Sequence, residues 1–335
     1  MNKKGFTLIE LLAVIVILAV IAIIAVPTVL NIIEDVRKSS AESSAKNIAK
    51  TAETYYMTNL AKGQSSSQID LTDGTLKYDG DKVKKGYLLY DEKGNAFGKM
   101  YINGYCVTHN VNNTVVSEKI NENECDTTIV YPNGYALYFN PKDNIKCDMA
   151  TSSRTGTNDT CMKWYAFLDN EESDTVKLLL DHNTTAMVPW NTDSNGVTPV
   201  TVEAKLQEDI ANWDNNVKTN ARLITASEVN QIVPNDGWKI NDLDGWYFLH
   251  TGSKTPYEGE FGSNKYAWLI DNTWYCGEYG CNFENQDAYG YWTSDYASAG
   301  VAWRIHYGGA LYYDGITSEL IGVRPVIEVP KSIFE

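Results

Sequence analysis

The sequence predicts an α+β fold in which a long N-terminal helix precedes a small antiparallel-sheet head and a second, C-terminal α+β domain. Every residue from Leu11 to Val26 is apolar, and a helical pattern continues to about residue 61. Short strand candidates separated by turn residues fill residues 68–130. A chain of 335 residues is also long enough for two domains besides the helix.

The apolar segment at the N-terminus contains one acidic residue. Between Phe6 and Leu30 the only charged side chain is Glu10. At about 1.5 Å per residue this segment is long enough to cross a bilayer core of about 30 Å. A charge at membrane depth costs at least ~2.5 kcal/mol, so Glu10 indicates a function and a partner.

The block Gly5-Phe6-Thr7-Leu8-Ile9-Glu10 resembles the class III leader of type IV pilins and pseudopilins. The resemblance implies that residues 1–5 are a leader, which a prepilin peptidase cuts off after Gly5 before it methylates Phe6. It also implies that Glu10 neutralises the Phe6 ammonium of a neighbouring pilin subunit. The alternative is a signal anchor with a chance glutamate.

Pro27, at the end of the apolar run, extends the resemblance, because pilins commonly carry a proline there. Proline removes a helical hydrogen bond, so we expect a kink or a local break at this residue. We predict an assembly helix over residues 6–61, whose second half is amphipathic and lies against a sheet.

Residues 62–135 are predicted to form the head, because helix, loop and antiparallel strands follow one another as in a pilin. The strand candidates are Val83–Tyr90, Lys99–Thr108 and Thr114–Ile120. Residues 136–160, rich in Asn, Asp, Ser and Thr, are interpreted as a linker.

All six cysteines lie after the membrane segment. An even count in an exported chain favours disulfides, although sequence alone leaves fifteen connectivities open. Proximity suggests Cys106–Cys125, Cys147–Cys161 and Cys276–Cys281. Their spacing does not match a zinc site, so no metal site is expected from them.

The second domain is predicted over residues 161–335. Met162–Asp169 and Thr175–Asp181 are typical of a hairpin, and Thr201 is a candidate cap for a following helix. Thr225 and Glu228 have the spacing of a capping box.

Three blocks in this domain are similar, in the same order, to the formylglycine-generating-enzyme branch of the C-type-lectin-like fold. They are Arg222-Leu223-Ile224-Thr225 with Glu228, Trp292-Thr293-Ser294-Asp295, and Gly322-Val323-Arg324. The resemblance implies a C-type-lectin-like domain, but a fold does not settle function.

An enzymatic role is the alternative that this second resemblance brings. The family's enzymes bind copper(I) through a cysteine pair that follows the second block, whereas Cys276 and Cys281 precede it. A hairpin disulfide is therefore the favoured interpretation, and no catalytic residue or enzymatic activity is expected.

Aromatic side chains are dense in the second domain, and most of them are expected in its core. Exposed ones suit stacking on a sugar or anchoring a protein. The candidate ligand-binding residues are Trp292, Asp295, His306, Tyr307 and Tyr312. Arg222, Arg304 and Arg324 are expected to form buried ion pairs instead.

No cofactor is expected, with calcium as the one alternative. Pro234-Asn235-Asp236 and Asn241-Asp242-Leu243-Asp244-Gly245 offer oxygen ligands, but such clusters more often form turns.

A net charge of −15 argues against binding nucleic acid through its phosphates. We expect a minor type IV pilin that starts in the cytoplasmic membrane, assembles through its N-terminal helix and reaches the pilus or cell surface. There it displays a module that binds an extracellular glycan or protein. The alternatives are a pilus-displayed enzyme and a structural pseudopilin of a type II-like secretion system.

Overall fold

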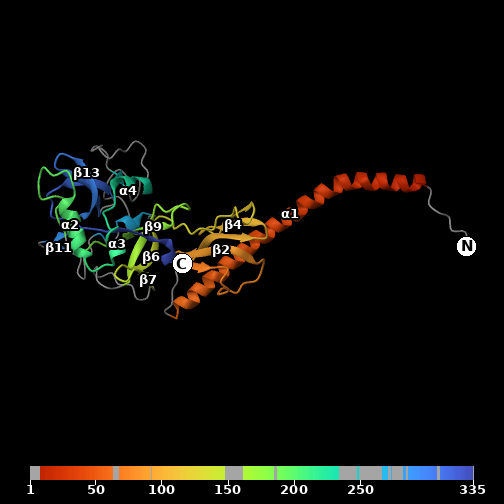
Figure 1. Ribbon diagram of the computed structural model, residues 1–335, viewed down its shortest axis with the longest axis horizontal. Coiled ribbons are helices and arrows are strands. Elements are labelled where there is room, and N and C mark those ends of the chain that lie inside the picture. The colour runs from red at the N-terminus through yellow and green to blue at the C-terminus, as the bar shows by residue number, and fades with distance from the viewer. Residues whose placement is uncertain are drawn as a thin grey trace, which may run out of the picture. The chain divides into compact units, whose positions relative to one another are not determined.

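The computed structural model (Figure 1) describes residues 8–334 except 63–67, 92, 148–160, 185–186, 234–246, 249–265, 271–272, 274–281, 284–285 and 308–309. The chain divides into two compact units. The first comprises Met1–Tyr55 and Ile69–Thr127, and the second comprises Tyr56–Gln68 and Thr128–Glu335.

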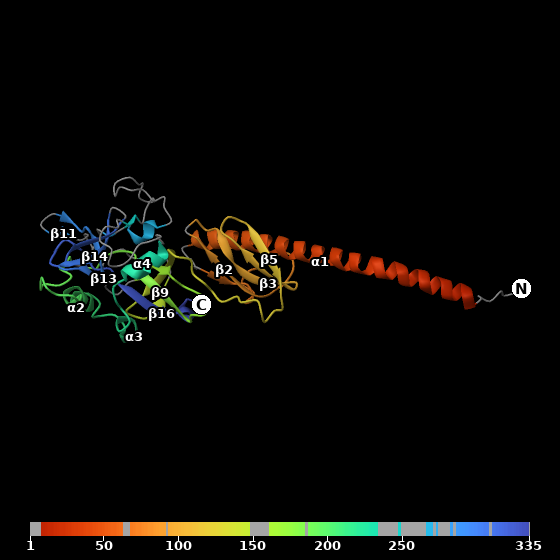
Figure 2. The same ribbon diagram turned by 90° about the horizontal axis from the view of Figure 1, so that it is seen from above.

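The first unit is built on α1 (Leu8–Leu60), which confirms the predicted long helix. Small and apolar side chains recur every three or four residues on the face that it buries, at Ala41, Ala45, Ile48 and Ala52. Alanines let the helix approach the sheet closely. Figure 2 shows the sheet lying along this half of α1.

The sheet of the first unit has five strands in sequence order. They are β1 (Gln68–Asp70), β2 (Val83–Tyr90), β3 (Ala96–Ile102), β4 (Tyr105–His109) and β5 (Val115–Lys119). From β2 to β5 each strand pairs antiparallel with the next, so the predicted helix and antiparallel head are both present.

The single strand predicted over Lys99–Thr108 is wrong, because the chain reverses inside it. Asn103 and Gly104 have φ angles of 52° and 90°, as the central residues of a type I′ turn require. Asn-Gly between apolar residues is a strong hairpin signal, and here it separates β3 from β4.

The first sheet of the second unit has the strand order β16-β9-β8-β6-β7. Its strands are β6 (Tyr135–Asn140), β7 (Ile145–Lys146), β8 (Met162–Phe167), β9 (Thr175–Leu180) and β16 (Val326–Pro330). The β8–β9 hairpin confirms the predicted one.

The predicted linker over 136–160 begins too early, because its first residues form β6 and β7. Leu137 and Phe139 are fully buried and alternate with the partly exposed Ala136 and Tyr138, a pattern that suits a strand. The later residues 148–160 lie outside the described part of the chain.

The second sheet has the strand order β10-β15-β14-β13, with a separate β11–β12 pair. These strands are β10 (Tyr247–Phe248), β11 (Asn282–Phe283), β12 (Gln286–Asp287), β13 (Gly290–Ser298), β14 (Val301–His306) and β15 (Ala310–Gly315). The helices of this unit are α2 (Val200–Asp209), α3 (Asn215–Lys218), α4 (Ala226–Ile232), η2 (Ala267–Leu269) and η3 (Lys331–Ile333).

One hydrophobic core joins the two sheets of the second unit to α4. It includes Tyr165, Phe167 and Leu179 from the first sheet, Tyr291, Trp303, Ile305 and Leu311 from the second, and Val229 and Ile232 from α4. The second unit therefore has a core of its own, as an independent domain needs.

Two predicted helix starts have different outcomes. The capping box of α4 is confirmed, because Thr225 Oγ1 accepts from Glu228 N and the Glu228 carboxylate accepts from Thr225 N. Thr201 does not cap α2, which begins one residue earlier after Pro199. Its hydroxyl oxygen instead accepts a hydrogen bond from the backbone N–H of Thr192.

Candidate functional site

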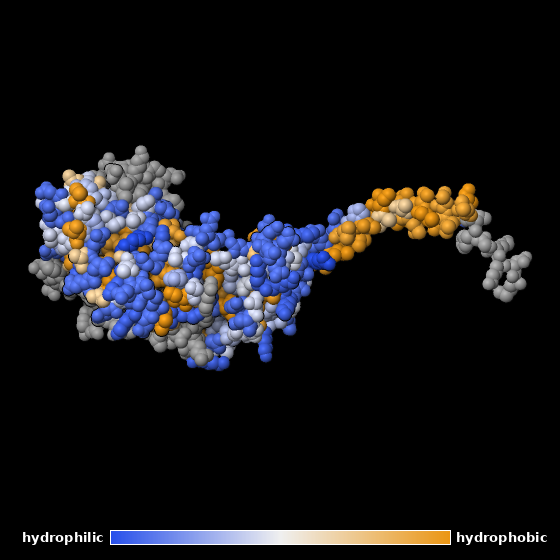
Figure 3. All heavy atoms as spheres, viewed as in Figure 1, coloured by the Kyte–Doolittle hydropathy of each residue, from blue (hydrophilic) through white to orange (hydrophobic). Residues whose placement is uncertain are grey.

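The N-terminal part of α1 is an exposed apolar surface. Among the described residues, α1 is the one helix whose length and composition are sufficient to cross a membrane. Its most apolar 18-residue window has a mean hydropathy of 3.3 and buries none of its residues within the chain. Figure 3 shows these side chains as a continuous orange surface. This surface needs a bilayer or neighbouring subunits to cover it.

Glu10 lies in the first turn of α1, among these exposed apolar residues. Gly5 and Phe6, the predicted cleavage and methylation residues, lie outside the described part of the chain.

Pro27 lies inside α1, which continues past it without a break. Because proline has no backbone N–H, one helical hydrogen bond is missing at this turn. Thr28 Oγ1 donates to the Ile24 carbonyl at 3.0 Å, a contact that also accompanies helix bending. Figure 1 shows α1 bending within its exposed half.

His306 ends β14, Tyr307 follows it and Tyr312 lies on β15, and all three lie near the charge of Arg304. The rings of His306 and Tyr307 stack with centroids 4.3 Å apart. Tyr312 pairs across the strands with Arg304, whose guanidinium lies 5.8 Å from the Tyr312 ring centre. The three candidates are partly exposed, so they form an aromatic patch that can stack on a ligand.

Charge at this aromatic patch is controlled by burial. Burial, with the nearby Arg304 charge second, lowers the pKa of His306 to about 4. Arg304 itself is buried and forms an ion pair with Asp314 at 3.1 Å. Near neutral pH the patch therefore carries an uncharged imidazole beside a compensated ion pair.

Trp292 is not available at the surface, so its assignment to a binding site is corrected. Its side chain is fully buried, and its indole N–H donates to the Val188 carbonyl at 2.7 Å. The ring fills the core, as is usual for tryptophan.

Asp295 lies away from the aromatic patch as a helix cap. Its Oδ2 accepts from the backbone N–H of Ala226 at 2.6 Å, at the first residue of α4. Burial raises the pKa of Asp295 although this hydrogen bond opposes the shift. The carboxylate thus satisfies a free N–H of the helix N-terminus.

The three arginines have two different roles. Arg304, which is buried, pairs with Asp314 as expected. Arg222 pairs with Glu228 at 2.6 Å, but its side chain is partly exposed and not buried as predicted. Arg324 differs, because its fully buried guanidinium donates to four backbone carbonyls. The acceptors are those of Leu180, Asp181, Trp268 and Leu269.

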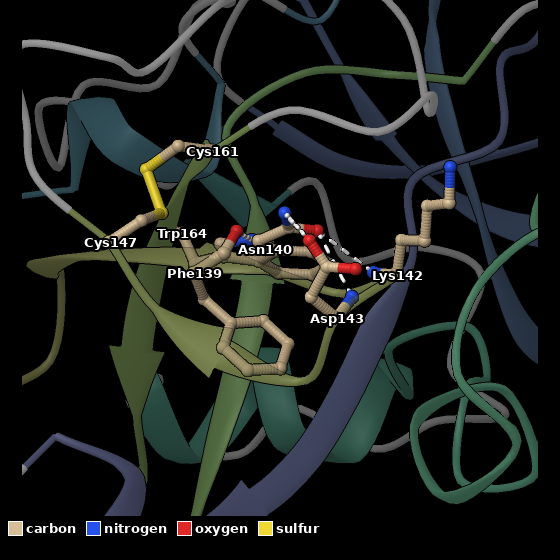
Figure 4. Close-up of a disulfide and its surroundings, with 7 residues drawn as sticks. All are labelled: Phe139, Asn140, Lys142, Asp143, Cys147, Cys161 and Trp164. Atoms are coloured by element: carbon tan, nitrogen blue, oxygen red, sulfur yellow. Dashed lines mark hydrogen bonds between the residues drawn. A yellow bond between two sulfur atoms is a disulfide. The ribbon is translucent and has the colours of Figure 1, made fainter.

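The structure contains two of the predicted disulfides, Cys106–Cys125 and Cys147–Cys161. Figure 4 shows the second one beside the turn that ends β6, where Asn140 Nδ2 donates to Asp143 Oδ2 at 2.8 Å. Cys276 and Cys281 lie outside the described residues.

No cluster of three or more His, Cys, Asp or Glu side chains is placed to hold a metal ion in the part of the chain that the structure describes. The candidate calcium ligands at 234–236 and 241–245 lie outside that part.

A cavity of about 570 Å³ was not foreseen from the sequence. It lies between α3 and the end of β16, and its lining includes Asn216 and Glu328. The clustered asparagines after Asp214 were the only local signal, and such residues usually indicate turns.

Similarity to a known family is found at the beginning of the chain. Residues 1–26 match a family described as the prokaryotic N-terminal methylation motif. No curated protein and no solved structure matches the chain.

Proposed function

We propose that this type IV pilin-like subunit, which its N-terminal methylation motif makes a substrate for a prepilin peptidase, is a minor pilin that displays the second unit as a ligand-binding, adhesin-like module. The motif and the apolar helix imply a membrane precursor that joins other pilin subunits at the cell surface. The observation that carries the proposal is the separate core of the second unit, because an assembly helix and a small head do not require it.

Contacts among the three blocks of the second unit support a C-type-lectin-like domain. The backbones of Arg222 and Val326 form an antiparallel β-bridge. The first block therefore lies beside β16, the strand that follows the third block. Ser294 N donates to the Ile224 carbonyl, which joins the second block to the first. Trp292 N donates to the Gly322 carbonyl, which joins the second block to the third.

We further propose that the second unit binds its ligand without catalysing a reaction. The aromatic patch of His306, Tyr307 and Tyr312 offers ring faces for stacking. Its one imidazole has a pKa near 4, which makes it a poor general base.

The test uses cells of the producing bacterium and antibodies against residues 128–335. The antibodies should label surface filaments on intact cells. Cells whose chain stops after residue 127 should still incorporate it into filaments but adhere less to mucin-, fibronectin- or polysaccharide-coated surfaces. If the antibodies detect the protein only in the membrane fraction, the second unit is not displayed on filaments, and a pseudopilin is favoured. Filament labelling with unchanged adhesion on all three surfaces contradicts the adhesin role.

A further inference from the structure

The cavity of the second unit has polar walls from elements far apart in sequence. One wall is α3, with Asn216 and Asn220, and the opposite wall is β16, with Glu328. Asn144, in the turn before β7, and Thr175, at the start of β9, complete it. Its volume of about 570 Å³ lies within the roughly 300–1,000 Å³ of small-molecule sites.

Asn220 and Glu328 have polar atoms already oriented by the protein. Asn220 Nδ2 donates to the Asn216 carbonyl at 3.1 Å, which leaves its amide oxygen as an acceptor. Thr175 Oγ1 donates to Glu328 Oε1 at 2.5 Å, which orients that carboxylate. The other carboxylate oxygen can accept from ligand hydroxyls.

The charge and the apolar part of the lining restrict the ligand class. Among the described residues, the cavity lining contains the carboxylate of Glu328 and no Lys, Arg or His, so it disfavours anions. Pro330, at the end of β16, is exposed in the lining and gives an aliphatic surface. Several amides, one carboxylate and an aliphatic patch suit a compound with many hydroxyl groups and C–H faces.

We propose that this cavity is a binding site for a neutral saccharide. The proposal rests on the display function argued above and locates one ligand site within the displayed unit. It is separate from the aromatic patch on β14 and β15, with which it shares no residue.

The test uses the full-length chain in detergent micelles on an array of neutral, sialylated and sulfated oligosaccharides. Asn216→Trp places a large ring in the cavity, and Glu328→Gln removes its charge while keeping its shape. Asn195→Trp is the matched control, because Asn195 is exposed in a loop outside the cavity. Thermal unfolding checks that each variant is folded.

The expected result is binding to one or more neutral saccharides. Asn216→Trp should weaken it at least about tenfold and Glu328→Gln by about three- to tenfold, with Asn195→Trp unchanged. If Asn216→Trp fails to fold, Glu328→Gln decides.

Three results overturn the saccharide site: no binding to any array member, binding that the cavity variants leave unchanged, and stronger binding to the sulfated or sialylated members. Each leaves the display function standing if antibodies still label filaments. Loss of that labelling overturns the display function whatever the array shows.

Discussion

Lys331 and Asp169 form a buried ion pair in the second unit, with Lys331 Nζ 2.9 Å from Asp169 Oδ1. Lys331 Nζ also donates to the carbonyls of Ile129 and Asn170, so three acceptors surround the ammonium group. The second carboxylate oxygen of Asp169 accepts from Tyr131 N. This network joins η3, near the C-terminal end, to the turn of the β8–β9 hairpin and to the segment that precedes β6.

Replacing one partner of this pair should destabilise the second unit strongly. In Lys331→Met the Asp169 carboxylate stays buried without its counter-ion, which typically costs about 3–5 kcal/mol. We expect a clear fall in the thermal unfolding midpoint of the full chain, followed by near-UV circular dichroism. The double variant Lys331→Met/Asp169→Leu should recover part of the loss, because it leaves no unpaired charge.

The matched control for this experiment is Lys84→Met. Lys84 pairs with Glu122 at 3.0 Å, but both side chains are largely exposed. Exposed pairs contribute at most about 1 kcal/mol. Equal losses in the Lys84 and Lys331 variants would contradict the special role of burial.

Asp295 should act as a helix cap and not as a ligand contact. Asp295→Ala removes the acceptor for the Ala226 N–H, and loss of a cap costs about 1 kcal/mol. The unfolding midpoint should therefore fall while saccharide or surface binding at temperatures well below it stays unchanged. An intact midpoint with lost binding would return Asp295 to the ligand-binding set.

His306 should make the folded state sensitive to acid. Its pKa is about 4 in the folded chain and close to 6.5 when unfolded, so the unfolded state takes up the proton first. Its stabilising contribution is present above pH 6.5 and is lost as the pH falls toward 4. The unfolding midpoint of His306→Phe should fall less over this window than that of the natural chain.

Tyr307→Phe is the control for this measurement, because it changes the neighbouring ring and leaves the His306 imidazole in place. It should keep the pH dependence of the natural chain. Identical slopes for His306→Phe and the natural chain would show that the buried imidazole is not the acid-sensitive group.

All six cysteines should form disulfides in the exported protein. Unreduced full chain, unfolded in denaturant and treated with iodoacetamide, should gain no label by mass spectrometry. After reduction all six cysteines should react. Labelling of Cys276 and Cys281 before reduction would contradict the third predicted disulfide and favour the copper-thiolate alternative.

Local patterns predicted the elements whose signal lies within a few residues. The helix period, the turn residues on either side of β2 and the Thr225–Glu228 spacing each depend on near neighbours. The split between β3 and β4 is also local, because the Asn103-Gly104 pair that turns the chain lies between the two strands.

Long-range pairing explains what the sequence did not predict. β16 pairs with β9 across about 150 residues, and the cavity forms only where α3 meets both strands. Residue type alone makes Trp292 and Asp295 candidates, but the neighbours that bury Trp292 and engage Asp295 come from other parts of the chain. Residue type alone does not distinguish a core tryptophan from an exposed one.

Assembly through the processed N-terminus is the central claim, and the most direct measurement is the N-terminal peptide mass of this chain in sheared filaments. The account predicts a peptide that begins at methylated Phe6, recovered with the filaments. A Glu10→Leu variant should be cleaved and methylated but scarce in filaments, because it lacks the carboxylate that pairs with a neighbour. An intact Met1–Gly5 leader, or full recovery of the Glu10→Leu chain in filaments, would contradict it.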